Sequence, residues 1–166
     1  MEDKLQKNII ILKDRLHVSS VLCNRSNIYY SRIKNCLLFP NMLISSVSMI
    51  FNNQNFDSTF LRYYNTIINS ITVFLLAVQT QLKISENADI FRSSSNSLLT
   101  LLHEIENKEN TGILTSEFVG TCNERYDLIM GNIPIIPSHI RDKTRTEYGG
   151  KFHLPIMINH IPKVVS

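Results

Sequence analysis

The sequence contains few of the residue patterns from which catalytic and metal sites are built. Only five glycines occur in 166 residues, so a glycine-rich phosphate loop is not expected. Cys23, Cys36 and Cys122 are odd in number and widely spaced, which predicts neither a disulfide framework nor a zinc site. The five histidines are scattered, and no serine or cysteine lies in a nucleophile motif. We therefore expect no enzyme, no catalytic residue, no cofactor, no metal ion and no small-molecule substrate.

Runs of basic residues are also missing. The net charge is only +3, and no five consecutive positions are Lys or Arg, so we expect no nucleic-acid partner. The N-terminal apolar run, residues 9–12, is too short for a secretory signal.

Charged residues are absent from two long stretches, residues 35–56 and residues 63–82. At a rise of about 1.5 Å per residue, each stretch can cross a hydrocarbon layer of about 30 Å. Pro40 is expected to kink or delimit the first helix, and the small residues Ser45, Ser46 and Ser48 suit close helix packing. The pattern predicts a two-span membrane hairpin over residues 35–82. The alternative is that both stretches are core helices of a soluble bundle.

The segment before the hairpin has the pattern of an amphipathic helix, residues 1–34. Its apolar positions, Leu5, Ile9, Leu12 and Leu16, follow at spacings of four, three and four. This segment contains seven basic residues and three acidic ones, whereas the loop between the spans has only Asp57 and Arg62 as charged residues. The positive-inside rule therefore predicts that both termini face the cytosol.

The segment after the hairpin, residues 83–131, is predicted to form cytoplasmic-side helices. No Gly or Pro interrupts residues 63–107, so we expect one long helix there. A second helix should begin at Thr115 or Ser116 and end at Gly131. It should bury Val119, Cys122, Tyr126 and Ile129. The long helix carries a seam at spacings of four and three that passes through Ser95 and is typical of coiled-coil self-association. The residues expected to self-associate are Ile84, Ala88, Phe91, Leu98, Leu102 and Ile105.

The last segment, residues 132–166, contains four of the five prolines and has no helical period. We expect an extended Pro-rich tail that becomes ordered against a partner, with a disordered tail as the alternative. The apolar residues expected to bind that partner are Ile133, Pro134, Ile135, Ile136, Pro137, Phe152, Leu154 and Pro155.

The order of these segments over residues 20–137 resembles the SLATT superfamily of two-transmembrane proteins. The resemblance includes a loose motif after the second span, at Glu86, Ala88, Phe91, Arg92, Leu98, Leu102, Glu104, Ile105 and Glu106. It implies an all-α fold, with a transmembrane helical hairpin whose long second helix extends into a cytoplasmic-side helical bundle.

The resemblance also implies two different roles. Relatives in large nucleocytoplasmic DNA viruses lead us to expect a structural protein, a minor capsid or inner-membrane component of the virion that tethers the membrane to the capsid shell. Its partners would be the lipid bilayer, other capsid or membrane proteins and further copies of itself, in the virion inner membrane or a host membrane. Bacterial members resemble pore-forming effectors, so the alternative is a multimeric two-transmembrane pore.

Overall fold

The computed structural model describes residues 2–52 and 58–159, with side chains for residues 5–50 and 59–158. The described residues are helical with short connections and contain no strand, which confirms the predicted all-α class. In chain order the helices are α1 (Glu2–Asn52), α2 (Ser58–Gln81), α3 (Ile84–Asn110), α4 (Ser116–Gly131), α5 (Ser138–Tyr148) and α6 (Ile156–Asn159).

The chain divides into two compact units. The first, which we call the bundle, comprises residues 1–27 and 89–166, and the second, the hairpin, comprises residues 28–88. Helices α1 and α3 contribute to both units. The predicted segment boundaries at 34/35 and 82/83 therefore lie six or seven residues inside the hairpin unit.

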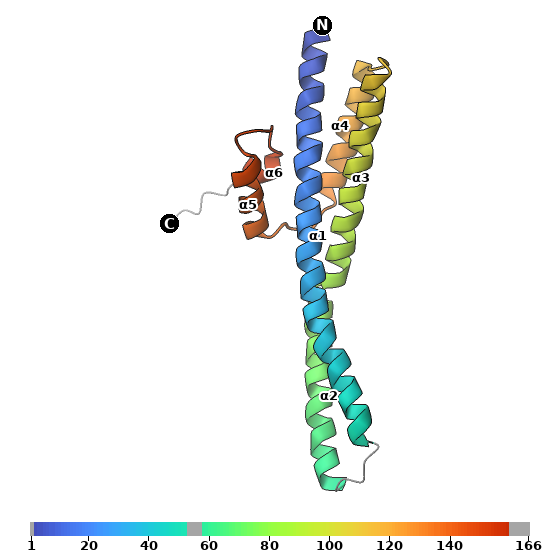
Figure 1. The fold of residues 1–166 in the computed structure, drawn as a ribbon, viewed down its shortest axis with the longest axis vertical. Coiled ribbons are helices and arrows are strands. Elements are labelled where there is room, and N and C mark those ends of the chain that lie inside the picture. The colour runs from blue at the N-terminus through green and yellow to red at the C-terminus, as the bar shows by residue number, and fades with distance from the viewer. Residues whose placement is uncertain (1, 53–57, 160–166) are drawn as a thin grey trace. The chain divides into compact units, whose positions relative to one another are not determined.

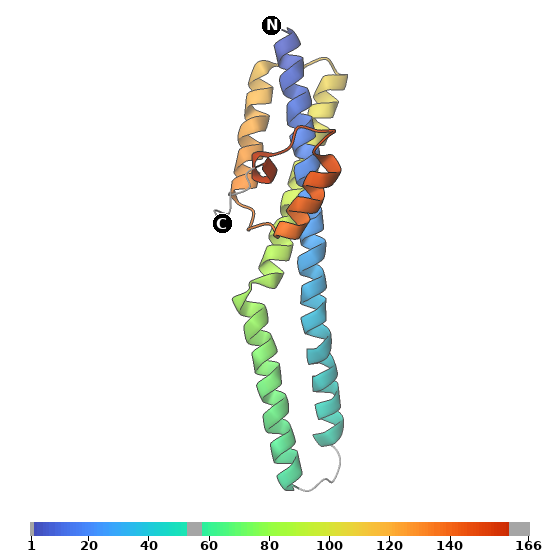
Figure 2. The same ribbon diagram turned by 90° about the vertical axis from the view of Figure 1, so that its left-hand side faces the viewer.

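In the bundle, the N-terminal part of α1 lies beside α3 and α4 (Figures 1 and 2). The apolar periodicity of residues 5–16 explains this packing, because Ile9, Leu12 and Leu16 fall on one side of α1 and are buried. Two hydrogen bonds link the helices in this interior. The hydroxyls of Ser19 and Tyr126 lie 3.1 Å apart, and Ser95 Oγ donates to the carbonyl of Ser20 at 3.0 Å.

Helix α4 begins and ends close to the predicted positions. The Thr115 side chain caps it by accepting a hydrogen bond from the Phe118 amide at 3.2 Å. Val119, Cys122 and Tyr126 are buried as predicted, whereas Met130 occupies the buried position expected for Ile129.

The prediction of an extended tail is wrong for much of its length. Residues 138–148 form α5, and a single turn, α6, follows after the bend at Gly149 and Gly150. Ile140 and Ile158 are buried together with Thr144, so part of the tail packs against its own chain. Residues 160–166, the end of the predicted tail, lie outside the described residues.

In the hairpin unit, the second part of α1 and helix α2 lie side by side and antiparallel (Figures 1 and 2). Pro40 does not delimit a helix, because α1 continues through it to Asn52. Proline has no N–H to donate, so the carbonyl of Cys36 loses its helical partner, and α1 tolerates this single loss.

The predicted continuous helix over residues 63–107 is also wrong, since α2 ends at Gln81 and α3 starts at Ile84. Lys83 lies between them with a left-handed backbone, φ +48°. Its amide donates to the Thr80 carbonyl at 3.1 Å, and the Asn87 side chain donates to the Leu82 carbonyl at 3.3 Å. These bonds satisfy carbonyls at the end of α2, as glycine-based helix ends do.

Candidate functional site

The hairpin turns its large apolar side chains outward. Leu43 in α1 and Phe74 in α2 are each 66% exposed. The chain thus has two helices long and apolar enough to cross a membrane, and their most apolar windows are 0% and 6% buried within the structure. A core helix of a soluble protein would be mostly buried instead. The other large apolar side chains exposed on the hairpin are Ile28, Leu38, Phe39, Met42, Val47, Met49, Ile50, Phe60, Tyr63, Ile67, Ile71, Val73, Leu76 and Leu82.

The inward side of the hairpin, by contrast, is partly polar. The half-buried positions of α1 include Asn41 and Ser48, and those of α2 include Asn65, Thr72 and Gln79. Within each helix these polar residues are seven apart, which places them on the same side every two turns. The seven-residue repeat of these polar residues is visible in the sequence and is the signal that predicts a partly polar face on each helix.

A groove of about 510 Å³ opens along one side of the hairpin. We call it the hairpin groove. The hydroxyls of Ser45 and Ser46 donate to the carbonyls of Asn41 and Met42 on their own helix, at 2.8 and 2.9 Å. The groove is lined by Leu38, Asn41, Met42, Ser45 and Ser46 from α1 and by Thr72, Leu76 and Gln79 from α2.

The residues predicted to mediate self-association lie in the interior of the chain's own fold. Ile84, Ala88, Phe91, Leu98, Leu102 and Ile105 are all buried. The seam is thus the face with which α3 packs within its own chain. Self-association through the same side chains would require them to leave that interior, because a buried apolar face has no free area for a second copy.

The C-terminal segment docks on α1 through polar and aromatic contacts within the bundle. Arg25 binds Glu147 at 2.7 Å and Thr144 Oγ1 at 3.1 Å. Asp14 Oδ2 accepts from the His153 amide at 3.1 Å and lies 2.8 Å from His153 Nδ1. These pairs orient α5 and the segment after it along α1. The His17 ring also contacts the rings of Tyr148 and Phe152, with centroids 6.1 and 5.6 Å away.

The structure separates the residues predicted to bind a partner through the tail. Pro155 is fully buried, and Phe152 and Leu154 are half-buried against the chain's own residues. Ile133, Pro134, Ile136 and Pro137 are also half-buried. Ile135 is different, since 91% of its surface is exposed. Of the predicted set, Ile135 is therefore the side chain most available to another molecule.

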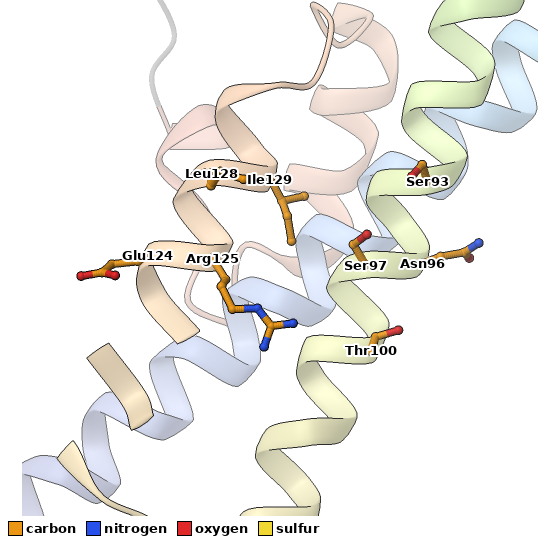
Figure 3. Close-up of a pocket in the computed structure, with 8 residues that line it drawn as sticks. All are labelled: Ser93, Asn96, Ser97, Thr100, Glu124, Arg125, Leu128 and Ile129. Atoms are coloured by element: carbon orange, nitrogen blue, oxygen red, sulfur yellow. The ribbon is translucent and has the colours of Figure 1, made fainter. Parts of the chain in front are cut away.

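A second groove, of about 550 Å³, lies between α3 and α4 in the bundle (Figure 3). Ser93, Asn96, Ser97 and Thr100 form one face of α3, since they are spaced three, one and three residues apart. From α4 it is lined by Glu124, Arg125, Leu128 and Ile129. Figure 3 shows Arg125 extending toward α3 while Glu124 points away.

The polar groups that line this second groove can form hydrogen bonds. Arg125 is paired through both terminal guanidinium nitrogens with Glu104, and this hydrogen bond raises the pKa of Arg125 above its usual value. Its charge is thus already compensated within the chain. The lining hydroxyls and the Asn96 amide are exposed and can donate or accept hydrogen bonds.

The buried ionisable groups of the bundle are held in their neutral forms. Burial raises the pKa of the Cys23 thiol to about 12, and it also raises the pKa of Cys122 and of Tyr126. Both thiols are therefore poor nucleophiles near neutral pH. Among the residues that the structure describes, no three His, Cys, Asp or Glu side chains come close enough to hold a metal ion.

Comparisons of the chain with protein-family models, with curated proteins and with solved structures found no match.

Proposed function

We propose that the chain is a structural membrane protein whose hairpin crosses a lipid bilayer through residues 35–82 and anchors the helical bundle to it. The observation that carries this proposal is the apolar exterior of the hairpin, whose most apolar windows are only 0% and 6% buried. Water penalises such an exterior, because each square ångström of apolar surface favours burial by about 25 cal/mol. A hydrocarbon layer removes that penalty.

The backbone of the hairpin also suits a bilayer. Hydrocarbon offers no hydrogen bonds, so a spanning segment must satisfy its backbone groups internally, as α-helices do. Helices α1 and α2 meet this condition apart from the Cys36 carbonyl opposite Pro40. The exposed hydroxyls of Ser45, Ser46, Thr66 and Ser70 bond back to their own helix four residues earlier. Few outward polar groups therefore remain to oppose insertion.

The two ends of the hairpin differ in charge, which gives the anchor a direction. Lys34 and Lys83 lie at the end from which α3 begins, and Lys34 Nζ donates to Ser85 Oγ at 2.9 Å. The loop end has only Arg62 and Asp57. The positive-inside rule then places both termini on the cytosolic side.

In this proposal the anchored bundle tethers the membrane to other proteins, and the resemblance to the SLATT superfamily supports this role. A viral relative would hold the inner membrane of the virion to the capsid shell, and the exposed surface of the bundle, including Ile135, would contact shell proteins. Several copies in one membrane would reinforce such contacts through their effective concentration.

The alternative role is a multimeric pore, and one observation favours it. The half-buried polar residues Asn41, Thr72 and Gln79 give the hairpin a polar side that could face a shared channel.

Reconstitution into liposomes that contain a trapped dye tests both roles. The anchor predicts that the full chain floats with the liposomes in a density gradient and that the dye stays inside. Flotation with dye release would favour the pore. A chain that remains with the soluble fraction would refute membrane insertion.

A further inference from the structure

We infer that the hairpin groove is a self-association site, in which the groove of one chain binds the same groove of a second copy within the membrane. This inference rests on the proposed membrane insertion of the hairpin. It places self-association at Asn41, Ser45 and Gln79 and away from the apolar seam of α3, which is buried in the chain's own fold.

The first reason is an unmet hydrogen-bonding need. Asn41 lines the groove, and its side-chain oxygen is enclosed by the hairpin without a hydrogen-bond partner. An amide moved from water into an apolar medium without a partner costs roughly 2–7 kcal/mol. Rotation of the Asn41 amide would turn this oxygen toward the groove, where lipid tails cannot supply the missing bond but a polar side chain of a second copy can.

The second reason is that a copy of the chain provides the required chemistry. The side-chain amides of Asn41 and Gln79 line the groove, and each carries both a donor group and an acceptor oxygen. Two identical grooves related by a twofold axis can therefore pair amide with amide, as isologous interfaces do. A lipid tail or a purely apolar helix lacks this complementarity.

The third reason is shape. Ser45 and Ser46 are small, and their hydroxyls are already bonded to their own helix, so they permit close approach of another helix. The exposed Met42 and Leu76 line the same groove. In a twofold arrangement each of these side chains can fill volume in the groove of the other copy.

Disulfide formation in membranes tests the inference. In a Cys36→Ser background, which removes the exposed native thiol, Ser45→Cys places a thiol in the groove. Val47→Cys is the matched control, because it is also exposed but lies roughly 200° further around α1 at nearly the same depth. After mild oxidation of carbonate-washed membranes, we expect disulfide-linked dimers for Ser45→Cys and at least several-fold fewer for Val47→Cys.

A third variant tests the role of the amide. Asn41→Leu added to Ser45→Cys should weaken association by roughly tenfold, since one polar contact between membrane helices contributes about that factor. Asn41→Gln keeps the amide and should retain most of the dimer.

Two outcomes would overturn the inference while leaving membrane insertion intact. One is equal dimer formation at positions 45 and 47 in washed membranes, and the other is an Asn41→Leu variant that dimerises as well as the parent. Loss of the protein from the washed membranes, in contrast, would refute the proposed function itself.

Discussion

Arginine on the outward face of the hairpin should release the protein from membranes. Leu43→Arg and Phe74→Arg place a charge near the middle of each uncharged stretch, at side chains that are 66% exposed. Leu128→Arg is the matched control, because Leu128 is 69% exposed but lies on α4 of the bundle. The three sites thus have similar exposure, and only their proposed surroundings differ.

The expected magnitude follows from insertion energies. At the centre of a membrane helix, leucine or phenylalanine contributes about −0.3 to −0.6 kcal/mol and arginine about +2.5 to +3.5 kcal/mol. Each substitution should therefore raise the free energy of insertion by roughly 3–4 kcal/mol, and the double variant by roughly 6–8 kcal/mol. A change of 3 kcal/mol alone shifts an equilibrium by more than about a hundredfold.

The assay is the fraction of protein that stays in a carbonate-washed membrane pellet. We expect the parent and Leu128→Arg to pellet, each single hairpin variant to pellet less, and the Leu43→Arg, Phe74→Arg double variant to be released. If the hairpin were instead in water, all three sites would be surface positions, where substitutions change stability by less than about 0.5 kcal/mol. Equal behaviour of the double variant and Leu128→Arg would thus refute the reasoning.

Three further predictions concern the fold. Phe91→Ala should destabilise the chain by about 3–5 kcal/mol in denaturant titrations, because Phe91 is fully buried; loss of an oligomer with unchanged unfolding would contradict this. Burial raises the pKa of the Cys23 thiol to about 12, so between about pH 9 and pH 12 this thiol is deprotonated in the unfolded chain but not in the folded chain. The free energy of unfolding should therefore fall by about 1.4 kcal/mol per pH unit over this range. Cys23→Ala should reduce this dependence of the free energy of unfolding on pH between pH 8 and 11. An unchanged slope would show that Cys23 is not its source. Lys83→Gly should stabilise the chain by about 1 kcal/mol in thermal unfolding and Lys83→Val should destabilise it, because φ is +48°; equal melting temperatures would refute this.

Local helical signals were predictable from the sequence. The cap at Thr115 and the buried positions 119, 122 and 126 follow from residue type and spacing alone, and the structure has them. The outward apolar surface of the hairpin follows likewise from the two stretches without charge.

Features that depend on distant contacts were not predictable. The C-terminal segment is ordered by pairs such as Arg25 with Glu147, which are 122 residues apart. No local pattern reveals such a contact, so the prolines suggested an extended tail. The break at Lys83 lacked a signal for another reason: lysine rarely adopts a left-handed backbone, and helix ends of this kind usually contain glycine.

The candidate site was predictable only in part. Spacing correctly marked one apolar face of α3, from Ile84 to Ile105, but a periodic face looks the same whether it packs against its own chain or a second copy. The hairpin groove needs three-dimensional information, because Asn41 and Gln79 come from different helices.

The most direct test of the central claim is the accessibility of the residues between α1 and α2 in sealed vesicles whose cytosolic side faces outward. Gln54→Cys and Glu117→Cys, each in the Cys36→Ser background, would be treated with a thiol reagent that cannot cross membranes. A spanning hairpin with cytosolic termini predicts immediate labelling at position 117 and labelling at position 54 only after detergent opens the vesicles. Equal labelling of both positions in intact vesicles would contradict it.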